Sequence, residues 1–253
     1  MSEARRIMIK VAYDGKAYHG WQAQEGMVTI ESRLNEALCE LLKEDIAVSG
    51  ASRTDAGVHA KGNLAVFDTH ARIPAEKVAA AMNTKLPEDI VVLESEEVAP
   101  DFHPRHCHSI KTYEYRILNT AVRDPLKNRY AHWTYVPLDV ERMKEAAVHL
   151  VGEHDYTSFC SVHAQTDTRV RTIYSLDVTR IGEEISIVVK GNGFLYNMVR
   201  IIAGTLMEVG RGHMEASKVK EILETRDRHL AGPTAPPNGL CLINIELQGR
   251  KTI

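Results

Sequence analysis

The chain has 253 residues, of which 44% are hydrophobic and 26% charged, as expected for a protein that can build one large core or two of ordinary size. A net charge of −3 argues against a generally basic nucleic-acid binder, so a site for a polyanion would have to be local. No run approaches the roughly 18 apolar residues of a membrane span, and the N-terminus lacks the apolar core of a signal peptide, so a cytoplasmic protein is expected.

The first half begins with an alternating apolar pattern that predicts a strand over residues 7–13. Residues 29–45 place their apolar side chains on one face of a helix, for which Thr29 is a suitable N-cap. A second helix is expected over residues 74–86, where Pro74 fits the first turn. The other strands of this half are expected at residues 46–48, 62–67 and 89–98.

The second half repeats this order. A strand is predicted over residues 111–119, and Asp139 would cap a helix over residues 140–151 that stops at Gly152. The rest should form a hairpin, a strongly apolar helix, a short helix, a Pro-rich loop and a last strand, at residues 175–191, 194–210, 215–226, 231–239 and 240–247.

This repeated order indicates an α+β protein made of two similar halves, residues 1–105 and 106–253. Each half would hold a mainly antiparallel sheet with helices packed on one face, and the active-site cleft would lie between the halves. The first half carries 12 Lys and Arg against 17 Asp and Glu, and the second carries 19 against 17. The asymmetry is mild, which again favours a local cleft over a charged face.

Several families of sites are excluded by their missing motifs. The chain has no P-loop, no Gly-rich dinucleotide motif, no nucleophile elbow and no zinc-deaminase pattern, which leaves cofactor-free chemistry or none. The segment "HPRHCH" (residues 103–108) gathers possible metal ligands, but no second pair with metal-site spacing accompanies it. A polar or basic loop is the preferred interpretation, and a metal-dependent RNA hydrolase is a weaker hypothesis.

Five residues stand out as candidates. Asp55 lies in "SRTDAG", whose composition is that of a turn, and Arg53 could be a surface charge, a phosphate contact or a filler of the gap left by an extruded base. Arg200 lies in a strongly apolar helix and needs a partner, at an interface or in a carboxylate such as Asp55. Tyr113 and Tyr115 share one face of a strand, where they could pack or stack on a nucleobase.

The stretch "RTDAGVHA", Arg53 to Ala60, resembles the signature of the tRNA pseudouridine synthase A family. Four further stretches are similar to the family and follow in the same order: "YDGKAYHGWQAQ", "KTYEYRI", "GNGFLYNMVRIIAGTL" and "PPNGLCLINI". The likeness therefore covers almost the whole chain, from about Ile7 to Leu247. Ser52 departs from the family, many members of which carry glycine there, but a small residue fits the turn in either case.

The resemblance implies an isomerase that converts uridine to pseudouridine at positions 38 to 40 of the tRNA anticodon stem-loop. The N1–C1′ bond of uridine would be cut, the base would turn, and C5 would join C1′. Neither cofactor nor metal is implied, and the enzyme would be a homodimer with tRNA laid across both subunits.

The resemblance also implies a role for each candidate. Asp55 would be the nucleophile, and whether it attacks C1′ or C6 stays open. Arg200 would pair with this carboxylate and keep it charged, while Tyr113 would stack on the flipped base and could serve as general base. Arg53 would help to hold the base out of the helix, and Leu240 would line the floor of the pocket.

Local basic residues would grip the tRNA, with these as candidates: Arg105, Lys111, Arg116, Arg123, Lys127, Arg129, Arg169 and Arg171. A catalytically silent tRNA-binding or RNA-folding protein on the same scaffold is the competing hypothesis. Only the enzyme needs Asp55, Tyr113 and Arg200 together, and the chain has all three.

Overall fold

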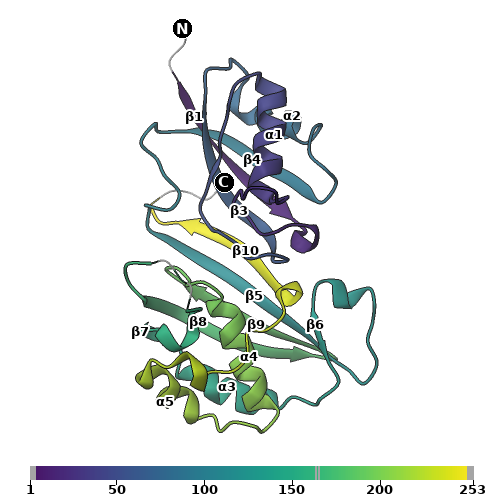
Figure 1. Cartoon of the computed structure of the whole chain (residues 1–253), viewed down its shortest axis with the longest axis vertical. Helices are drawn as coiled ribbons and strands as arrows, with labels where there is room; N and C mark the ends of the chain where they lie inside the picture. The colour runs from purple at the N-terminus through teal and green to yellow at the C-terminus, as the bar shows by residue number, and fades with distance from the viewer. Residues whose placement is uncertain (1–3, 163, 165, 250–253) are drawn as a thin grey trace. The chain divides into compact units, whose positions relative to one another are not determined.

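The computed structural model describes residues 4–162, 164 and 166–249, and the chain divides into two compact units. Unit 1 is formed by the chain up to Ser109 and again from Leu242, whereas unit 2 is Ile110–Cys241. Each unit combines strands with helices, which confirms the α+β class (Figure 1). The division differs from the expected halves in one respect, because most of the last strand belongs to unit 1. The expected domains at residues 1–105 and 106–253 stay a prediction.

Unit 1 has four main strands and one short strand. The main strands lie in the order β4-β1-β3-β10, at Ile90–Val98, Arg5–Tyr13, His59–Thr69 and Leu240–Leu247. Strand β1 is antiparallel to both neighbours, and the short β2 (Ser49–Gly50) pairs with β3 at Ala65 and Val66. Helices α1 (Ile30–Leu42) and α2 (Ala75–Met82) pack against each other, and α2 packs on β4.

Helix α1 begins where the sequence predicts, because its first turn is capped reciprocally. The Thr29 hydroxyl accepts a hydrogen bond from the backbone N–H of Ser32 at 3.2 Å, and the Ser32 hydroxyl accepts one from the N–H of Thr29 at 3.1 Å. The face buried against the unit 1 core carries Ile30, Leu34, Ala37 and Leu38.

In unit 2 the main strands follow the order β5-β9-β8-β7, at Ser109–Asn119, Glu184–Gly191, Val170–Ile181 and Gly152–Asp155. These pairs are antiparallel, but the short β6 (His132–Thr134) runs parallel to β5. The helices of this unit are α3, α4 and α5, at Val140–Val148, Met198–Gly210 and Lys218–Thr225. Helix α3 packs on β8 and against α4, and α5 lies next to it (Figure 1).

Five short 3-10 helices complete the described chain, at Gly15–Ala17, Lys127–Arg129, Thr157–Phe159, Arg228–Leu230 and Pro237–Gly239. Of the helices that the structure describes, none combines the length and the apolar character that crossing a membrane requires.

Two predicted boundaries, one in each unit, are wrong. The strand expected at residues 46–48 is instead β2 at Ser49–Gly50, because the N–H of Val48 bonds to Asn35 Oδ1 of α1 at 2.8 Å rather than to a strand. The apolar helix expected from residue 194 begins at Met198, because Asn197 adopts φ 61°, a left-handed conformation outside a helix.

The region after α3 also differs from the prediction. This helix ends at Val148, and Gly152, expected to stop it, opens β7 with φ 117°. A side chain at that φ would be strained, so the glycine serves the start of an unpredicted strand.

Candidate functional site

Asp55 opens a tight turn between β2 and β3. The N–H of Val58 donates to the carbonyl oxygen of Asp55 at 3.1 Å, and Gly57, the third residue of the turn, has φ 78°. That φ favours glycine, and aspartate is common at the first position of turns. The predicted turn around Asp55 is thus confirmed by the backbone, and its aspartate is held at a fixed place.

Burial alternates over residues 52–55, which lead into this turn. Ser52 and Thr54 are each 7% exposed, whereas Arg53 is exposed and Asp55 is half-buried. The more accessible pair, Arg53 and Asp55, is therefore the one that can meet a substrate.

The buried side is anchored to the sheet. The hydroxyls of Tyr13 and Thr54 lie 2.7 Å apart in a buried hydrogen bond. The side-chain amide of Asn63 donates to the carbonyl oxygen of Ser52 at 2.9 Å. The anchoring side chains come from the neighbouring strands β1 and β3, so the Asp55 turn is fastened to the sheet of unit 1.

The first loop of the chain closes over the same turn. The N–H of Trp21 donates to the carbonyl of Thr54 at 3.0 Å, and the N–H of Gly57 donates to the carbonyl of Tyr18 at 3.2 Å. A Cβ on Gly20, which has φ 85°, would lie 2.7 Å from the Thr54 carbonyl oxygen. Only glycine permits this close approach. The "YHGW" and "RTDAG" segments therefore pack directly on each other.

The "HPRHCH" segment docks beside the Asp55 turn. His103 Nε2 lies 3.2 Å from the Ser49 hydroxyl, and Arg105 Nε donates to the carbonyl of Gly50 at 2.8 Å. The rings of His103 and His106 stack with their centroids 4.3 Å apart. Among the described residues, no group of three or more His, Cys, Asp or Glu side chains is placed to hold a metal ion.

In unit 2, Tyr113 and Tyr115 occupy one face of β5. Tyr113 is 6% exposed and meets the ring of Phe194 edge to face, with centroids 5.2 Å apart and planes at 84°. Tyr115 is fully buried and its hydroxyl donates to the carbonyl of Pro236 at 2.9 Å. Burial raises the pKa of Tyr115, and the charge of Arg200 acts in the opposite direction, so Tyr115 is a neutral packing residue.

Arg200 lies in the first turn of α4, and its guanidinium is held by local contacts. Its Nε donates to the carbonyl of Ala235 at 2.7 Å, and one Nη donates to Asn197 Oδ1 at 2.8 Å. The backbone N–H of Ala235 donates in turn to the carbonyl of Arg200 at 3.1 Å. The guanidinium is therefore oriented before any substrate arrives.

The Pro-rich loop that supplies Ala235 is packed tightly on α4. A Cβ on Gly204 would lie 1.8 Å from the carbonyl oxygen of Pro233. The N–H of Gly232 donates to the hydroxyl of Thr205 at 2.9 Å. Leu240, 5% exposed, follows this loop as the first residue of β10. The loop thereby brings Leu240, Tyr115 and Arg200 into one neighbourhood of unit 2.

The predicted residues fall into two groups. Arg53 and Asp55 lie in unit 1, whereas Tyr113, Arg200 and Leu240 lie in unit 2. Their assembly into one active site stays a prediction. Sequence reasoning did not find Phe194 or Ala235, since the contacts of both depend on segments distant along the chain. The small-residue run "GNGF" was the available signal for Phe194.

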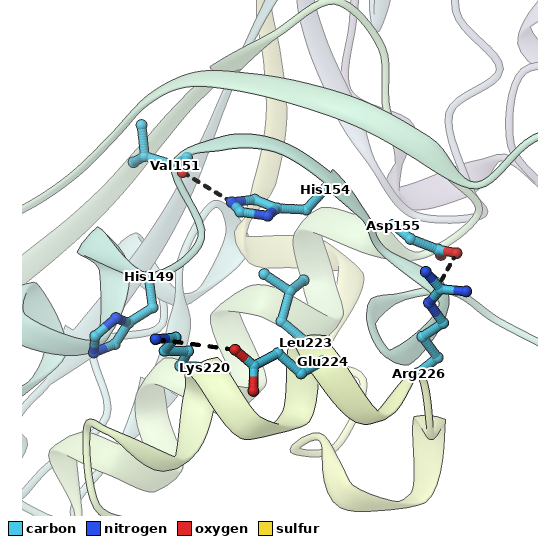
Figure 2. Close-up of a pocket in the computed structure, with 8 residues that line it drawn as sticks. All are labelled: His149, Val151, His154, Asp155, Lys220, Leu223, Glu224 and Arg226. Carbon is cyan, nitrogen blue, oxygen red and sulfur yellow. Dashed lines mark hydrogen bonds and ion pairs between the residues drawn. The ribbon is translucent and has the colours of Figure 1, made fainter.

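Figure 2 shows a separate pocket of about 430 Å³ in unit 2, between the end of α3, β7 and α5. Arg226 Nε lies 3.3 Å from Asp155 Oδ2, and Lys220 Nζ lies 4.0 Å from Glu224 Oε1. Each carboxylate on the wall is matched by a cation, so the pocket has no marked preference for one sign of charge. Its lining is His149, Val151, His154, Asp155, Lys220, Leu223, Glu224 and Arg226, and contains none of the predicted site residues.

Comparison with known proteins identifies the family to which this chain is similar. The model of a family described as tRNA pseudouridine synthase matches residues 9–106 and 146–247. The tRNA pseudouridine synthase A of Brevibacillus brevis is 47% identical over 94% of this chain and 98% of its own length. The tRNA pseudouridine synthase A 2 of Clostridium perfringens is 45% identical over the same shares, and the tRNA pseudouridine synthase A of Halalkalibacterium halodurans is 43% identical over 98% of this chain and 97% of its own.

Proposed function

The chain belongs to the tRNA pseudouridine synthase family and is an isomerase, and we propose that it converts uridine to pseudouridine at positions 38 to 40 of the tRNA anticodon stem-loop. The observation that carries the proposal is the Asp55 turn. A half-buried carboxylate is held there by buried hydrogen bonds to Ser52 and Thr54, inside the matched residues 9–106. A nucleophile needs such a fixed position, because orientation supplies much of its effect.

The reaction is a rearrangement with balanced atoms. The N1–C1′ bond of uridine breaks, the base turns, and a C5–C1′ bond forms. The proton lost from C5 is balanced by the proton gained at N1, so nothing is oxidised or reduced. Such chemistry needs neither metal nor cofactor, and the protein has to supply a nucleophile, a base and a pocket that holds the loose uracil.

The predicted side chains fit these tasks. Asp55 serves as the nucleophile, and Arg200 pairs with it and favours its charged form. In this proposal Tyr113, whose ring contacts Phe194 edge to face, stacks on the flipped uracil and moves the C5 proton. Arg53 contacts the RNA beside the vacated position, and Leu240 forms the apolar floor.

The base has to leave its stack before Asp55 can reach it. Enzymes that act on a nucleobase within a helical stem extrude it into a pocket. Support for this step comes from Arg53, which is exposed two residues before Asp55. A guanidinium bound to the RNA backbone beside an extruded base can help to hold that base out of the helix.

We assign a homodimer as the working assembly, supported by exposed apolar side chains in residues 120–136. Val122 is 81% exposed, Leu126 83% and Tyr135 67%, and apolar groups gathered in this way mark interfaces. Val122→Glu combined with Leu126→Glu should reduce the mass measured by sedimentation to that of a monomer. Val148→Glu, at a side chain 69% exposed at the end of α3, should leave the mass unchanged.

The assignment to the cytoplasm is supported by the cysteines. Cys39, Cys107, Cys160 and Cys241, all among the described residues, carry thiols rather than disulfides. This state is typical of a reducing compartment, where tRNA is also found. Fractionation of cells that express the tagged chain should place it with soluble tRNA.

The central test is product mapping. Wild type and Asp55→Ala are incubated with tRNA that has uridines in the anticodon arm, and pseudouridine is mapped at single-nucleotide resolution. We expect product at positions 38 to 40 with wild type and none with the variant. Retained tRNA binding by Asp55→Ala would show that the loss concerns chemistry.

The matched control is Asp45→Asn, an exposed aspartate in the same unit. It should keep wild-type activity. If folded wild type binds several tRNAs and forms no pseudouridine, the proposed reaction is wrong and the silent tRNA-binding protein takes its place. Product outside the anticodon arm would preserve the reaction and overturn the position.

A further inference from the structure

Arg105 is the part of the "HPRHCH" segment that the proposed reaction leaves unexplained. Its Nε donates a hydrogen bond to the backbone carbonyl of Gly50 at 2.8 Å. Gly50 precedes Arg53 by three residues in the sequence, so this bond holds the Arg105 guanidinium near the segment that carries Arg53. The Ser49–His103 contact, 3.2 Å long, fixes the loop at the adjacent residue of β2. These two side-chain contacts hold the loop that carries Arg105 against β2, the short strand before the Asp55 turn.

The fixed position brings two like charges together. Burial lowers the pKa of Arg105, and the neighbouring charge of Arg53 lowers it further. Glu31 acts in the opposite direction, but it is the weakest of the three influences, and its Oε2 accepts a hydrogen bond from the N–H of Ala23 at 2.7 Å. Arg53 and Arg105 thus place two positive charges beside the single carboxylate of Asp55, which favours a backbone phosphate of the RNA at this place.

His103 does not add to this positive charge at neutral pH. Burial lowers the pKa of His103, and His106, Arg105 and Arg6 lower it further. The positive charge at this place therefore comes from the two arginines. Because their charge does not depend on pH in the physiological range, the site is permanent.

We propose that Arg53 and Arg105 together bind one backbone phosphate of the tRNA substrate, next to the nucleotide that faces Asp55. The proposal rests on the proposed function and deepens it, because it names the group that positions the RNA. Guanidiniums match a phosphate with two parallel hydrogen bonds, and a phosphate bound between two of them would relieve their repulsion. Arg105 would act as a binding residue that sets the register of the strand, and Arg53 would hold the same phosphate from the side of Asp55.

The test measures equilibrium binding of unmodified tRNA by Asp55→Ala, which removes turnover, with and without Arg105→Gln. Removal of one charged contact should weaken binding about tenfold. The slope of log affinity against log salt should fall by about 1, the value for one phosphate contact. Arg72→Gln, an exposed arginine elsewhere in unit 1, is the matched control and should change neither quantity.

Two more variants separate a shared phosphate from a general charge effect. Arg105→Lys keeps the charge but loses the planar fork, so it should keep the salt slope and weaken binding by a smaller factor. Arg53→Gln combined with Arg105→Gln should lose less affinity than the product of the two single losses, since both contact one phosphate. Full additivity would overturn the shared phosphate.

Circular dichroism and thermal unfolding establish that each variant is folded. An unchanged affinity and slope for folded Arg105→Gln would overturn the inference, even if wild type makes pseudouridine. Conversely, a reduced slope in a chain that makes no pseudouridine would keep the phosphate site and reject the reaction. The two proposals therefore fail separately.

Discussion

The hydroxyl of Tyr13 lies 2.7 Å from the hydroxyl of Thr54, directly before the turn that carries Asp55. Tyr13 is 5% exposed and Thr54 7%, so this hydrogen bond is sheltered from water. The side-chain amide of Asn63 is also directed at the Tyr13 hydroxyl, at 3.4 Å. A polar group buried under the turn thereby links the position of Asp55 to the central strands.

Tyr13→Phe removes the tyrosine hydroxyl, so the buried Thr54 hydroxyl loses this hydrogen bond. We expect the free energy of unfolding to fall by about 1–2 kcal/mol. We also expect kcat to fall several-fold, because the Asp55 turn loses an anchor. Urea unfolding and pseudouridine formation under saturating tRNA measure the two effects.

Tyr156→Phe is the matched control for this variant. Tyr156 is fully buried directly after β7 in unit 2, and its hydroxyl donates to the carbonyl of Leu150 at 2.7 Å. It should show a similar loss of stability with kcat unchanged. An equal fall of kcat in both variants would mean that Tyr13 acts only through overall stability.

The edge-to-face contact between Tyr113 and Phe194 should matter for turnover. Phe194→Leu removes a contact of about 0.5–1.5 kcal/mol, and we expect kcat/KM to fall by about threefold to tenfold. Phe159→Leu removes another buried ring of unit 2 and should lower stability while kcat/KM stays near wild type. If Phe194→Leu keeps full kcat/KM, Tyr113 does not depend on this ring.

Gly204 should be among the least replaceable residues of α4. A Cβ there would lie 1.8 Å from the Pro233 carbonyl oxygen, so Gly204→Ala must displace the loop that orients Arg200. We expect a loss of about 3 kcal/mol in the free energy of unfolding, together with a fall in kcat.

Gly182→Ala measures the energetic cost of placing a side chain on a left-handed backbone, without any steric contact. Gly182 has φ 58°, and a Cβ added there would meet no described atom within 4 Å, so the loss should be about 1 kcal/mol with kcat unchanged. Denaturant unfolding compares the two variants directly. Equal losses of the free energy of unfolding would show that steric contact with Pro233 is not the reason why Gly204 resists replacement.

Stability should fall on mild acidification, and His132 is one cause. Burial lowers the pKa of His132, and the charge of Arg211 lowers it further, from an ordinary value of 6.5. As the pH falls below this ordinary value, His132 binds a proton in the unfolded chain but stays neutral in the folded chain. The unfolded state is therefore favoured, and the free energy of unfolding decreases as the pH falls. His103, with its pKa lowered by burial and by His106, acts in the same direction.

The measurement compares urea midpoints at about pH 7.5 and about pH 5.5, a range that spans the ordinary histidine pKa. His132→Gln should reduce the difference between the two midpoints relative to wild type. His229→Gln, at an exposed histidine, should leave the difference unchanged. An undiminished difference in His132→Gln would assign the pH dependence to other groups.

Local signals in the sequence were sufficient where the structure is decided locally. The Thr29 cap and the Asp55 turn follow from hydrogen bonds within three residues, and both predictions are confirmed. The start of α4 is different, because the left-handed Asn197 occupies a conformation that its residue type permits but does not demand.

The surroundings of the candidate residues could not be predicted for a related reason. Arg200 was expected to need a partner, but its bond to the carbonyl of Ala235 joins residues 35 positions apart. Arg105 finds the carbonyl of Gly50 across 55 positions. Backbone carbonyls carry no signature of residue type, so such partners are invisible in a pattern of side chains.

Strand β10 gives the order of synthesis a structural consequence. One edge of β3 is paired with β1, and β10, whose residues from Leu242 belong to unit 1, is its neighbour on the other side. The ribosome makes all of Ile110–Cys241 before that strand emerges. During this interval β2 covers that edge only at Ala65 and Val66, so the nascent first unit holds an incomplete sheet. The uncovered stretch of β3 can pair with a neighbouring chain until the last strand is made.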